Sequence, residues 1–214
     1  MIEAKLRSFV DQPSAGLLKI KKNLQEIKAR AIFLDRDGVI NKYPGDTKYV
    51  TSLKEFRFLP GAKKAIALLA KSGFKIFVIS NQGGVNKGLF SADALAEITR
   101  KMLSDIEEAG GKVDGVYYCI HRQDENCSCR KPKAGLIHTA MTASPLDMKD
   151  SFFVGDTIRD IATAKSAGCK SILVFSGKEK AANSDKWEVR PDFTFDNLYK
   201  AAKFIHTFKE GQLK

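Results

Sequence analysis

The sequence predicts an α/β protein in which a largely parallel sheet forms the middle of three layers, with helices on both faces. Short apolar segments alternate with amphipathic segments along most of the chain, and this alternation is typical of β–α–β units. Polar residues follow three of the apolar segments directly, at positions 35, 80 and 156. Because parallel strands end at one edge of a sheet, these residues are expected to meet there.

The composition is that of an ordinary globular protein. Hydrophobic residues make up 43% of the 214 residues, enough for one sizeable domain. No apolar run approaches the ~20 residues of a membrane span, and the N-terminus lacks the apolar core of a secretory signal. We therefore expect a cytoplasmic protein with no membrane span. The net charge of +11 indicates an anionic partner or substrate, and it leaves nucleic acid, a phosphorylated metabolite and a membrane surface open.

Residues 1–30 differ from the rest of the chain and are expected to form a basic extension. They hold seven Lys or Arg residues and three Asp or Glu residues. Apolar residues between 17 and 27 recur at a loose helical spacing, which predicts a helix. This helix either packs on the domain or binds an acidic surface, and the short, irregular apolar stripe favours packing. The remaining domain is placed at residues 31–214.

Residues 31–34 are predicted to form a buried strand that ends in a pair of carboxylates. Asp35 and Asp37 are two residues apart, so an extended backbone would place both side chains on one face. Gly38 then permits a tight turn, and the polar loop at 42–47 could close over a substrate. Taken alone, this stretch is equally compatible with a polar turn whose Asp residues cap a helix.

The remaining segments continue the alternation of strands and helices. A helix at 62–71 precedes a strand at 75–79, and this strand ends at Ser80, where a hydroxyl could hold an anion. Ser91 is the predicted N-cap of a helix that ends before Gly110. The later elements are a strand at 116–119, a helix at 134–143, a strand at 151–154, a helix at 158–167, a strand at 171–175, a polar loop at 176–192 anchored by Trp187, an edge strand at 193–195 and a helix at 196–208.

A cluster of metal-binding residue types follows the third predicted strand. Cys119, His121, Cys127 and Cys129 have the spacing C-x-H-x5-C-x-C, and four such ligands are typical of a structural zinc site. The intervening segment is polar, so a metal would give it order. A disulfide and free thiols are the alternatives, and the absence of an export signal disfavours the disulfide. Cys169 lies apart in an apolar context and is expected in the core.

The polar residues at the predicted strand ends have complementary chemistry. The carboxylates of Asp35, Asp37 and Asp156 would repel one another, and oxygen ligands beside a phosphate suit Mg²⁺. Ser80 and Lys131 could orient phosphoryl oxygens, while one carboxylate attacks phosphorus and another moves a proton. The set predicts Mg²⁺-dependent phosphoryl transfer, and the missing GxxxxGK[ST] motif argues against a nucleotide-driven kinase.

Four sequence blocks resemble the motifs of the haloacid dehalogenase (HAD) superfamily of phosphohydrolases. They are DRDGVIN (35–41), SNQ (80–82), RKPK (130–133) and VGDTIRD (154–160), in the order that the superfamily has them. The resemblance implies a Rossmann-like fold with Asp35 as nucleophile and Asp37 as general acid/base. It further implies that Ser80 and Lys131 hold the phosphoryl group, that Asp35, Asp156 and the backbone carbonyl of Asp37 bind Mg²⁺, and that Asp160 plays a supporting role.

The zinc cluster directly before RKP is similar to one subgroup of that superfamily. This subgroup contains heptose 1,7-bisphosphate and histidinol-phosphate phosphatases, which are small and lack a large cap domain. The segment NQGGVNKG is closer to the heptose enzymes, whose loop usually reads NQSGIARG, although Gly83 and Lys87 depart from it, and Ala134 departs from RKPxPG. The resemblance implies removal of the 7-phosphate of D-glycero-D-manno-heptose 1,7-bisphosphate, with histidinol phosphate as the alternative substrate. The expected substrate-binding residues are Asn41, Asn81, Gln82, Lys87 and Arg130.

Two other functions fit the sequence less well. A phosphatase of nucleic-acid ends would use the positive charge, but the basic residues are scattered and no aromatic stacking platform is evident. A non-catalytic zinc-binding module has no need for the Asp35 and Asp37 pair. We therefore expect the partner to be a phosphorylated small molecule, and separately we expect the chain to be a monomer.

Overall fold

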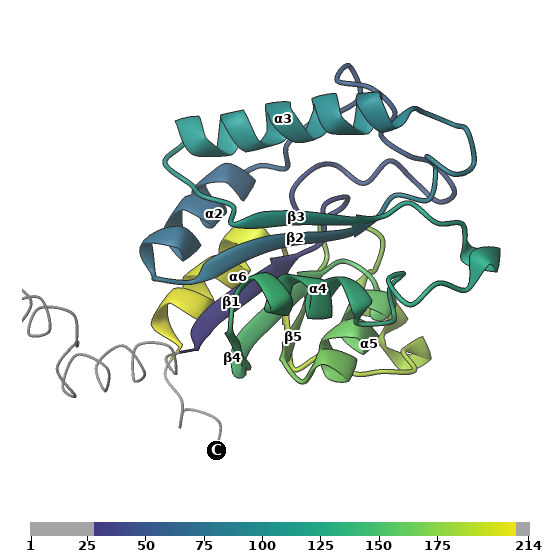
Figure 1. Ribbon diagram of the computed structural model, residues 1–214. Helices are drawn as coiled ribbons and strands as arrows, with labels where there is room; N and C mark the ends of the chain where they lie inside the picture. The colour runs from purple at the N-terminus through teal and green to yellow at the C-terminus, as the bar shows by residue number, and fades with distance from the viewer. Residues whose placement is uncertain (1–27, 209–214) are drawn as a thin grey trace, which may run out of the picture.

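The computed structural model describes residues 28–208, and its centre is a six-stranded parallel sheet (Figure 1). The strand order is β3-β2-β1-β4-β5-β6. The chain therefore builds outward from β1 in one direction and then in the other. The strands are β1 (Ala29–Leu34), β2 (Lys75–Asn81), β3 (Gly115–Cys119), β4 (Leu146–Gly155), β5 (Lys170–Val174) and β6 (Phe193–Phe195).

Helices cover both faces of this sheet, which confirms the predicted three-layer architecture. Helices α2, α3 and α6 pack into one apolar core with the sheet, while α4 and α5 pack into a second core on the opposite face (Figure 1). The described chain shows no large cap domain. The helices are α2 (Ala62–Lys71), α3 (Ala92–Glu108), α4 (Gly135–Ala143), α5 (Ile158–Ala167) and α6 (Leu198–Thr207), with short 3₁₀ helices at Gln123–Glu125 and Ala181–Lys186.

Strand β1 is buried on both sides because it lies at the centre of the sheet. The side chains of residues 31–34 have no exposed surface, which explains why this segment is apolar throughout rather than alternating. The ring of Phe33 stacks between those of Phe77 and Phe153, with centroid distances of 5.7 and 6.3 Å. Burying one such ring contributes about 2–3 kcal/mol, so the central strand anchors the loop that follows it.

Most predicted elements are found close to their predicted bounds, and β4 differs most. It begins at Leu146, five residues before the predicted start, because its pairing with β1 shifts register between Arg30 and Ile32. The Ser151 hydroxyl bridges the irregularity, since it accepts a hydrogen bond from the Ala31 amide and donates one to the Asp147 carbonyl. The Ser151 side chain therefore links β1 to the first part of β4, which was not predicted to be a strand.

The predicted helix start and loop anchor are also present. The Ser91 hydroxyl accepts a hydrogen bond from the Ala94 amide at 3.1 Å and caps α3. Trp187 stacks on Phe175 and donates its indole N–H to Glu179, so it does anchor the 176–192 loop. The helix expected within residues 17–27 lies outside the described residues.

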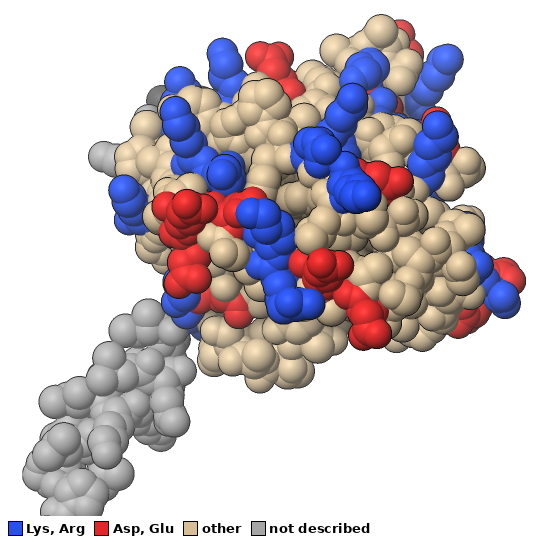
Figure 2. Space-filling model, turned by 90° about the horizontal axis from the view of Figure 1, so that it is seen from above, with Lys and Arg blue, Asp and Glu red and all other residues tan. Residues whose placement is uncertain are grey.

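The surface carries charges of both signs. On the face seen in Figure 2, Lys and Arg side chains are interspersed with Asp and Glu side chains. None of the helices at residues 28–208 is long and apolar enough to cross a bilayer.

Candidate active site

Polar side chains from several strand ends line one cleft of about 580 Å³, which we call the strand-end cleft. Asp35 follows β1, Ser80 lies near the end of β2, and Asp156 follows β4. Because β1 pairs with both β2 and β4, these three ends are neighbours in the sheet. The structure thus brings the predicted catalytic residues together at the point where the strand order reverses, the usual place for a site in such sheets.

Lys131 forms the floor of the cleft together with two carboxylates. Its ammonium lies 2.9 Å from Asp35 Oδ1 and 2.6 Å from Asp160 Oδ1, and it donates to the Ile79 carbonyl at 3.1 Å. The side chain is only 3% exposed, so these acceptors replace its hydration shell. Asp160 therefore fixes the position of a buried cation next to Asp35.

The two oxygens of Asp35 have different surroundings. Oδ1 accepts hydrogen bonds from the Arg36 amide at 2.7 Å and from Lys131. Within residues 28–208, no hydrogen bond to Oδ2 is found. Asp35 therefore has one anchored oxygen and one unengaged oxygen, as a positioned nucleophile requires.

Ser80 is held by the amide of Gln82. The Gln82 Nε2 group donates to Ser80 Oγ at 3.1 Å and to Asp37 Oδ2 at 2.9 Å. Since Ser80 Oγ accepts in this contact, its own proton is free to be donated to a bound anion. Ser80 is 2% exposed, so such a bond would form in a largely dry environment.

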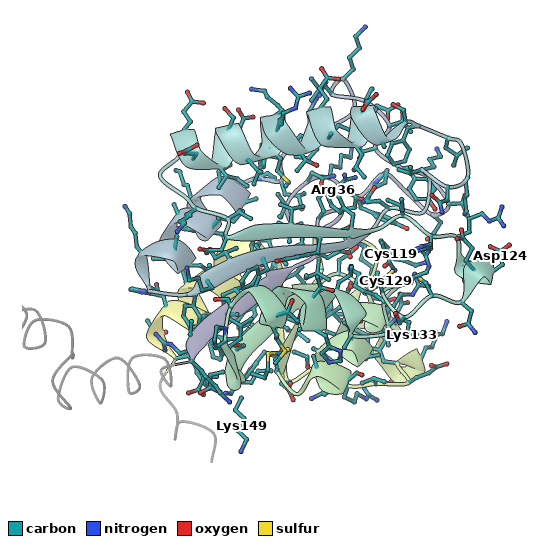
Figure 3. The ribbon with its side chains drawn as sticks, viewed as in Figure 1. Arg36, Cys119, Asp124, Cys129, Lys133 and Lys149 are labelled. Atoms are coloured by element: carbon teal, nitrogen blue, oxygen red, sulfur yellow. The ribbon has the colours of Figure 1, made fainter. Side chains whose placement is uncertain are left out.

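Asp37 is oriented by a buried arginine. The Arg36 guanidinium contacts both carboxylate oxygens of Asp37, and Asn41 Nδ2 donates to Oδ1 at 2.8 Å. Arg36 has no exposed surface and lies beneath α3 (Figure 3). Asp35 and Asp37 both line the strand-end cleft whereas Arg36 is buried outside it, so the two carboxylates share one side as expected, although β1 ends at Leu34 and the chain bends at Arg36.

The carboxylates of the cleft carry unbalanced negative charge. Ligand oxygens of Asp35, Asp156 and Asp160 lie within 4.8 Å of one another. Burial raises the pKa of Asp35 to about 6; the charge of Lys131 opposes this, and the charges of Asp160 and Asp37 add to it. Burial, together with the charges of Asp35 and Asp160, raises the pKa of Asp156 well above its usual value. A divalent cation with oxygen ligands would relieve this repulsion, so the donor set fits Mg²⁺.

The four predicted zinc ligands also converge. The Sγ atoms of Cys119 and Cys127 lie 3.6 Å apart, those of Cys127 and Cys129 lie 3.4 Å apart, and His121 Nδ1 is 3.2 Å from Cys129 Sγ. Tetrahedral ligands about 2.3 Å from an ion are separated by about 3.8 Å, so these atoms fit a zinc ion. The sulfurs are too far apart for a disulfide, which would bring them to about 2.05 Å.

Comparisons with known proteins identify the family. A family model described as HAD-hydrolase-like matches residues 128–201. The D-glycero-β-D-manno-heptose-1,7-bisphosphate 7-phosphatase of Neisseria meningitidis serogroup A is 34% identical over 178 residues, which cover 82% of this chain and 94% of that protein. The chain belongs to the HAD-like hydrolases.

A further relative and a solved structure of a similar protein support the assignment of this chain to the HAD-like phosphatases. The phosphatase of the same name from Vibrio cholerae is 38% identical over 69% of this chain and 82% of that protein. The D,D-heptose 1,7-bisphosphate phosphatase of B. bronchiseptica, solved with magnesium and phosphate, has a TM-score of 0.76 and 32% identity over 81% of this chain and 96% of its own.

The phosphatase places the five expected substrate-binding residues in two groups. Asn81, Lys87 and Arg130 line the strand-end cleft. Asn41 and Gln82 are fully buried behind Asp37 and contact its carboxylate, so their geometry is that of positioning residues. Asn81 also clamps the Lys131 backbone, since it accepts from the Lys131 amide at 3.1 Å and donates to the carbonyl at 3.2 Å.

Gly83, one of the two departures from the loop pattern, has a steric explanation in this phosphatase. A Cβ atom at this position would lie 2.8 Å from the His121 carbonyl oxygen and 3.1 Å from the Arg130 guanidinium. The absence of a side chain therefore lets the loop that carries the Cys/His cluster (119–129) pack against the loop after β2. Lys87, the other departure, places its ammonium 5.6 Å from the ring centroid of Tyr49 at the edge of the cleft.

Sequence reasoning missed a group of residues beside the carboxylate cluster of Asp35, Asp156 and Asp160. Residues 176–180 follow the end of β5 and were expected to be only a polar loop, yet the Lys178 amide donates to Asp156 Oδ2 at 2.8 Å. The Ser176 hydroxyl donates to the Gly38 carbonyl, which joins this loop to the one after β1. The available signal was the position of Ser176-Gly177 directly after the strand predicted at 171–175, the same layout as at the other site residues.

Replacing Gly177 by Ala is expected to weaken Mg²⁺ binding about 10- to 100-fold, because outer contacts of metal ligands have effects of this size. A Cβ atom at Gly177 would lie 2.0 Å from Asp156 Oδ2 and would push that carboxylate aside. The measurement is the Mg²⁺ concentration that gives half-maximal activity. Gly168→Ala is the control, since it strains a positive-φ position in open space and lowers stability without touching the site. Equal Mg²⁺ dependence of Gly177→Ala and the wild type would contradict this account.

Proposed function

We propose that this chain is a Mg²⁺-dependent phosphatase that removes the 7-phosphate of D-glycero-D-manno-heptose 1,7-bisphosphate through an aspartyl-phosphate on Asp35. The observation that carries the proposal is the charge layout of the strand-end cleft. Asp35, Ser80 and Lys131 lie at its base, and further cations lie around its rim, namely Lys48, Lys87, Arg130, Arg159 and Lys178. One phosphoryl group would be held at the base, so the rim cations favour a substrate that carries a second anionic group.

The proposed reaction follows from the contacts at the base of the cleft. Asp35 attacks phosphorus, the bond to the leaving oxygen breaks, and Asp37 gives that oxygen a proton. Asp37 then takes a proton from water as the water attacks the aspartyl-phosphate, which releases phosphate and restores Asp35. Ser80 and Lys131 orient the phosphoryl oxygens throughout, and Asp160 holds Lys131 in place.

Mg²⁺ would be held by Asp35, Asp156 and the backbone carbonyl of Asp37, and it would neutralise charge on the phosphoryl oxygens. Asp160 belongs to the same carboxylate cluster, but it already bonds Lys131 and Thr157 and is better suited to positioning. Zinc would be structural, because Cys119, His121, Cys127 and Cys129 supply four ligands and leave no open position.

Phosphate release over a small substrate panel tests this function. The panel contains both anomers of heptose 1,7-bisphosphate, histidinol phosphate, fructose 1,6-bisphosphate and a 3′-phosphorylated oligonucleotide, each with Mg²⁺ and with EDTA. We expect kcat/KM for one heptose anomer to exceed that for every other compound by at least about tenfold, since a substrate of another shape leaves polar groups of the site unpaired. A preference for histidinol phosphate would overturn the substrate, and activity that EDTA leaves unchanged would overturn the metal.

A further inference from the structure

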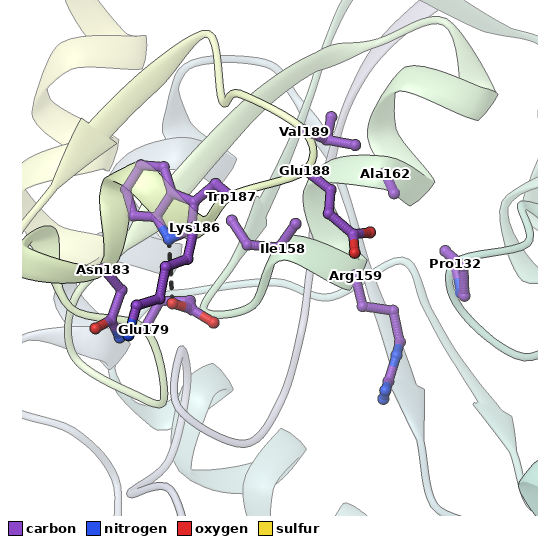
Figure 4. Close-up of a pocket in the computed structure, with 10 residues that line it drawn as sticks. All are labelled: Pro132, Ile158, Arg159, Ala162, Glu179, Asn183, Lys186, Trp187, Glu188 and Val189. Carbon is purple, nitrogen blue, oxygen red and sulfur yellow. Dashed lines mark hydrogen bonds between the residues drawn. The ribbon is translucent and has the colours of Figure 1, made fainter.

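Arg159 occupies a junction between the strand-end cleft and two neighbouring hollows. It is the second residue of α5 and is exposed. It lines the cleft, a hollow of about 280 Å³ that it shares with Arg130 beside the loop at 119–129, and a groove of about 550 Å³ beside Trp187 (Figure 4). Arg159 therefore borders the cleft and both neighbouring hollows.

Among residues 28–208, the guanidinium of Arg159 has no hydrogen-bond or ion-pair partner. Lys131 is paired with Asp35 and Asp160, Lys178 is paired with Asp46 at 2.7 Å, and Arg130 donates to the His121 carbonyl at 3.1 Å. By contrast, the Arg159 side chain makes no ion pair or hydrogen bond with any residue of the described range 28–208. Figure 4 shows it directed away from the carboxylates of Glu179 and Glu188.

The backbone at Arg159 is fixed relative to the phosphoryl site. The Thr157 hydroxyl caps α5 and, with Asp160, forms a capping box. Asp160 is buried and bonds Lys131 at the floor of the cleft, while the adjacent Arg159 is exposed at its rim. Lys48 also lacks a partner among the described residues, but it lies on a loop rather than on a capped helix.

We infer that Arg159 is a specificity-determining residue that pairs with a second phosphoryl group of the substrate, distal to the one transferred at Asp35. A planar guanidinium can donate two parallel hydrogen bonds to phosphate oxygens, which a lysine ammonium cannot do. This inference rests on the proposed function, and it adds a residue of α5 that the sequence motifs did not single out.

The test compares Arg159→Met with the wild type on heptose 1,7-bisphosphate and on p-nitrophenyl phosphate, which has no second anionic group. We expect kcat/KM for the bisphosphate to fall about 10- to 100-fold, mainly through KM, because a hydrogen bond to a charged group has this effect. The value for p-nitrophenyl phosphate should change less than about twofold, and Arg159→Lys should restore part of the loss. Lys186→Met is the control, since Lys186 is an exposed cation that lines the Trp187 groove and not the cleft. Its kcat/KM values for both substrates should match those of the wild type.

A second readout separates this inference from the proposed substrate. Fructose 1,6-bisphosphate and fructose 6-phosphate are compared as inhibitors of p-nitrophenyl phosphate hydrolysis, and Arg159→Met should lose the advantage of the bisphosphate. A wild type that does not hydrolyse heptose bisphosphate would overturn the substrate, while this inhibition ratio would still report on Arg159. Equal losses on both substrates, or an unchanged ratio of inhibition constants, would overturn the role of Arg159.

Discussion

Replacing Asp35 by Asn is expected to lower kcat at least about 10⁴-fold, because an amide oxygen cannot form the aspartyl-phosphate. Asn retains the shape of Asp and can still accept from the Arg36 amide at the same oxygen. The measurement is phosphate release from heptose bisphosphate with saturating Mg²⁺. The fold should persist, since β1 is anchored by the apolar side chains of residues 31–34.

Asp185→Asn is the matched control for this change. Asp185 is exposed in the 3₁₀ helix at Ala181–Lys186 and does not line the strand-end cleft. Its variant should keep full activity and the melting temperature of the wild type. Full activity of Asp35→Asn would contradict the aspartyl-phosphate mechanism.

The same Asp35→Asn variant is expected to be more stable than the wild type above about pH 6 when Mg²⁺ is absent. The pKa of Asp35 is raised from 3.8 to about 6 in the folded protein, chiefly by burial. The folded state therefore holds this proton more tightly than the unfolded state, and stability is lost as the pH rises between these values. The difference is about 1–3 kcal/mol at pH 7.5 and disappears below about pH 4. Chemical denaturation at both pH values with EDTA measures it, and a less stable variant at pH 7.5 would contradict the raised pKa of the buried Asp35 carboxyl.

Replacing Cys129 by Ser is expected to abolish stoichiometric zinc binding and to lower the melting temperature by roughly 10 °C, or about 3 kcal/mol. Three ligands would remain, and the loop between Cys119 and Cys129 has few apolar contacts of its own beyond those of its cysteines. Figure 3 shows Cys119 and Cys129 side by side at the loop that leads toward Lys133. Because Arg130 and Lys131 follow the cluster directly, activity should fall with zinc content.

Zinc content of the purified protein, the melting temperature and kcat/KM are measured together. Cys169→Ala is the control, since Cys169 is buried beside α5 and lies outside the cluster. It should keep about one zinc per chain. A Cys129→Ser protein with unchanged zinc content would refute the ligand assignment, as would a wild type that lacks zinc.

Much of the fold could be predicted from short-range patterns in the sequence. The apolar run before Asp35 predicted a strand buried on both faces, and Ser91 predicted the start of α3, because burial and capping depend on residues close in sequence. The convergence of Cys119, His121, Cys127 and Cys129 was likewise predictable, since all four lie within eleven residues. Even the meeting of Asp35, Ser80 and Asp156 followed from strand ends alone, because parallel strands share one carboxyl edge.

Only the tertiary structure decided which polar residues form hydrogen bonds with one another at that edge of the sheet. Asn81 clamps the Lys131 backbone 50 residues away, and the Lys178 amide donates to Asp156 from a loop with no recognisable motif. Such contacts depend on the register of the strands and on the course of the loops. Neither can be predicted from the residues next to the contact in the sequence. The sequence alone therefore predicted which kinds of residue the site contains. Packing decided that Asn41 and Gln82 lie behind Asp37. It also decided that Arg159 lines the cleft and that its guanidinium has no partner in the described chain.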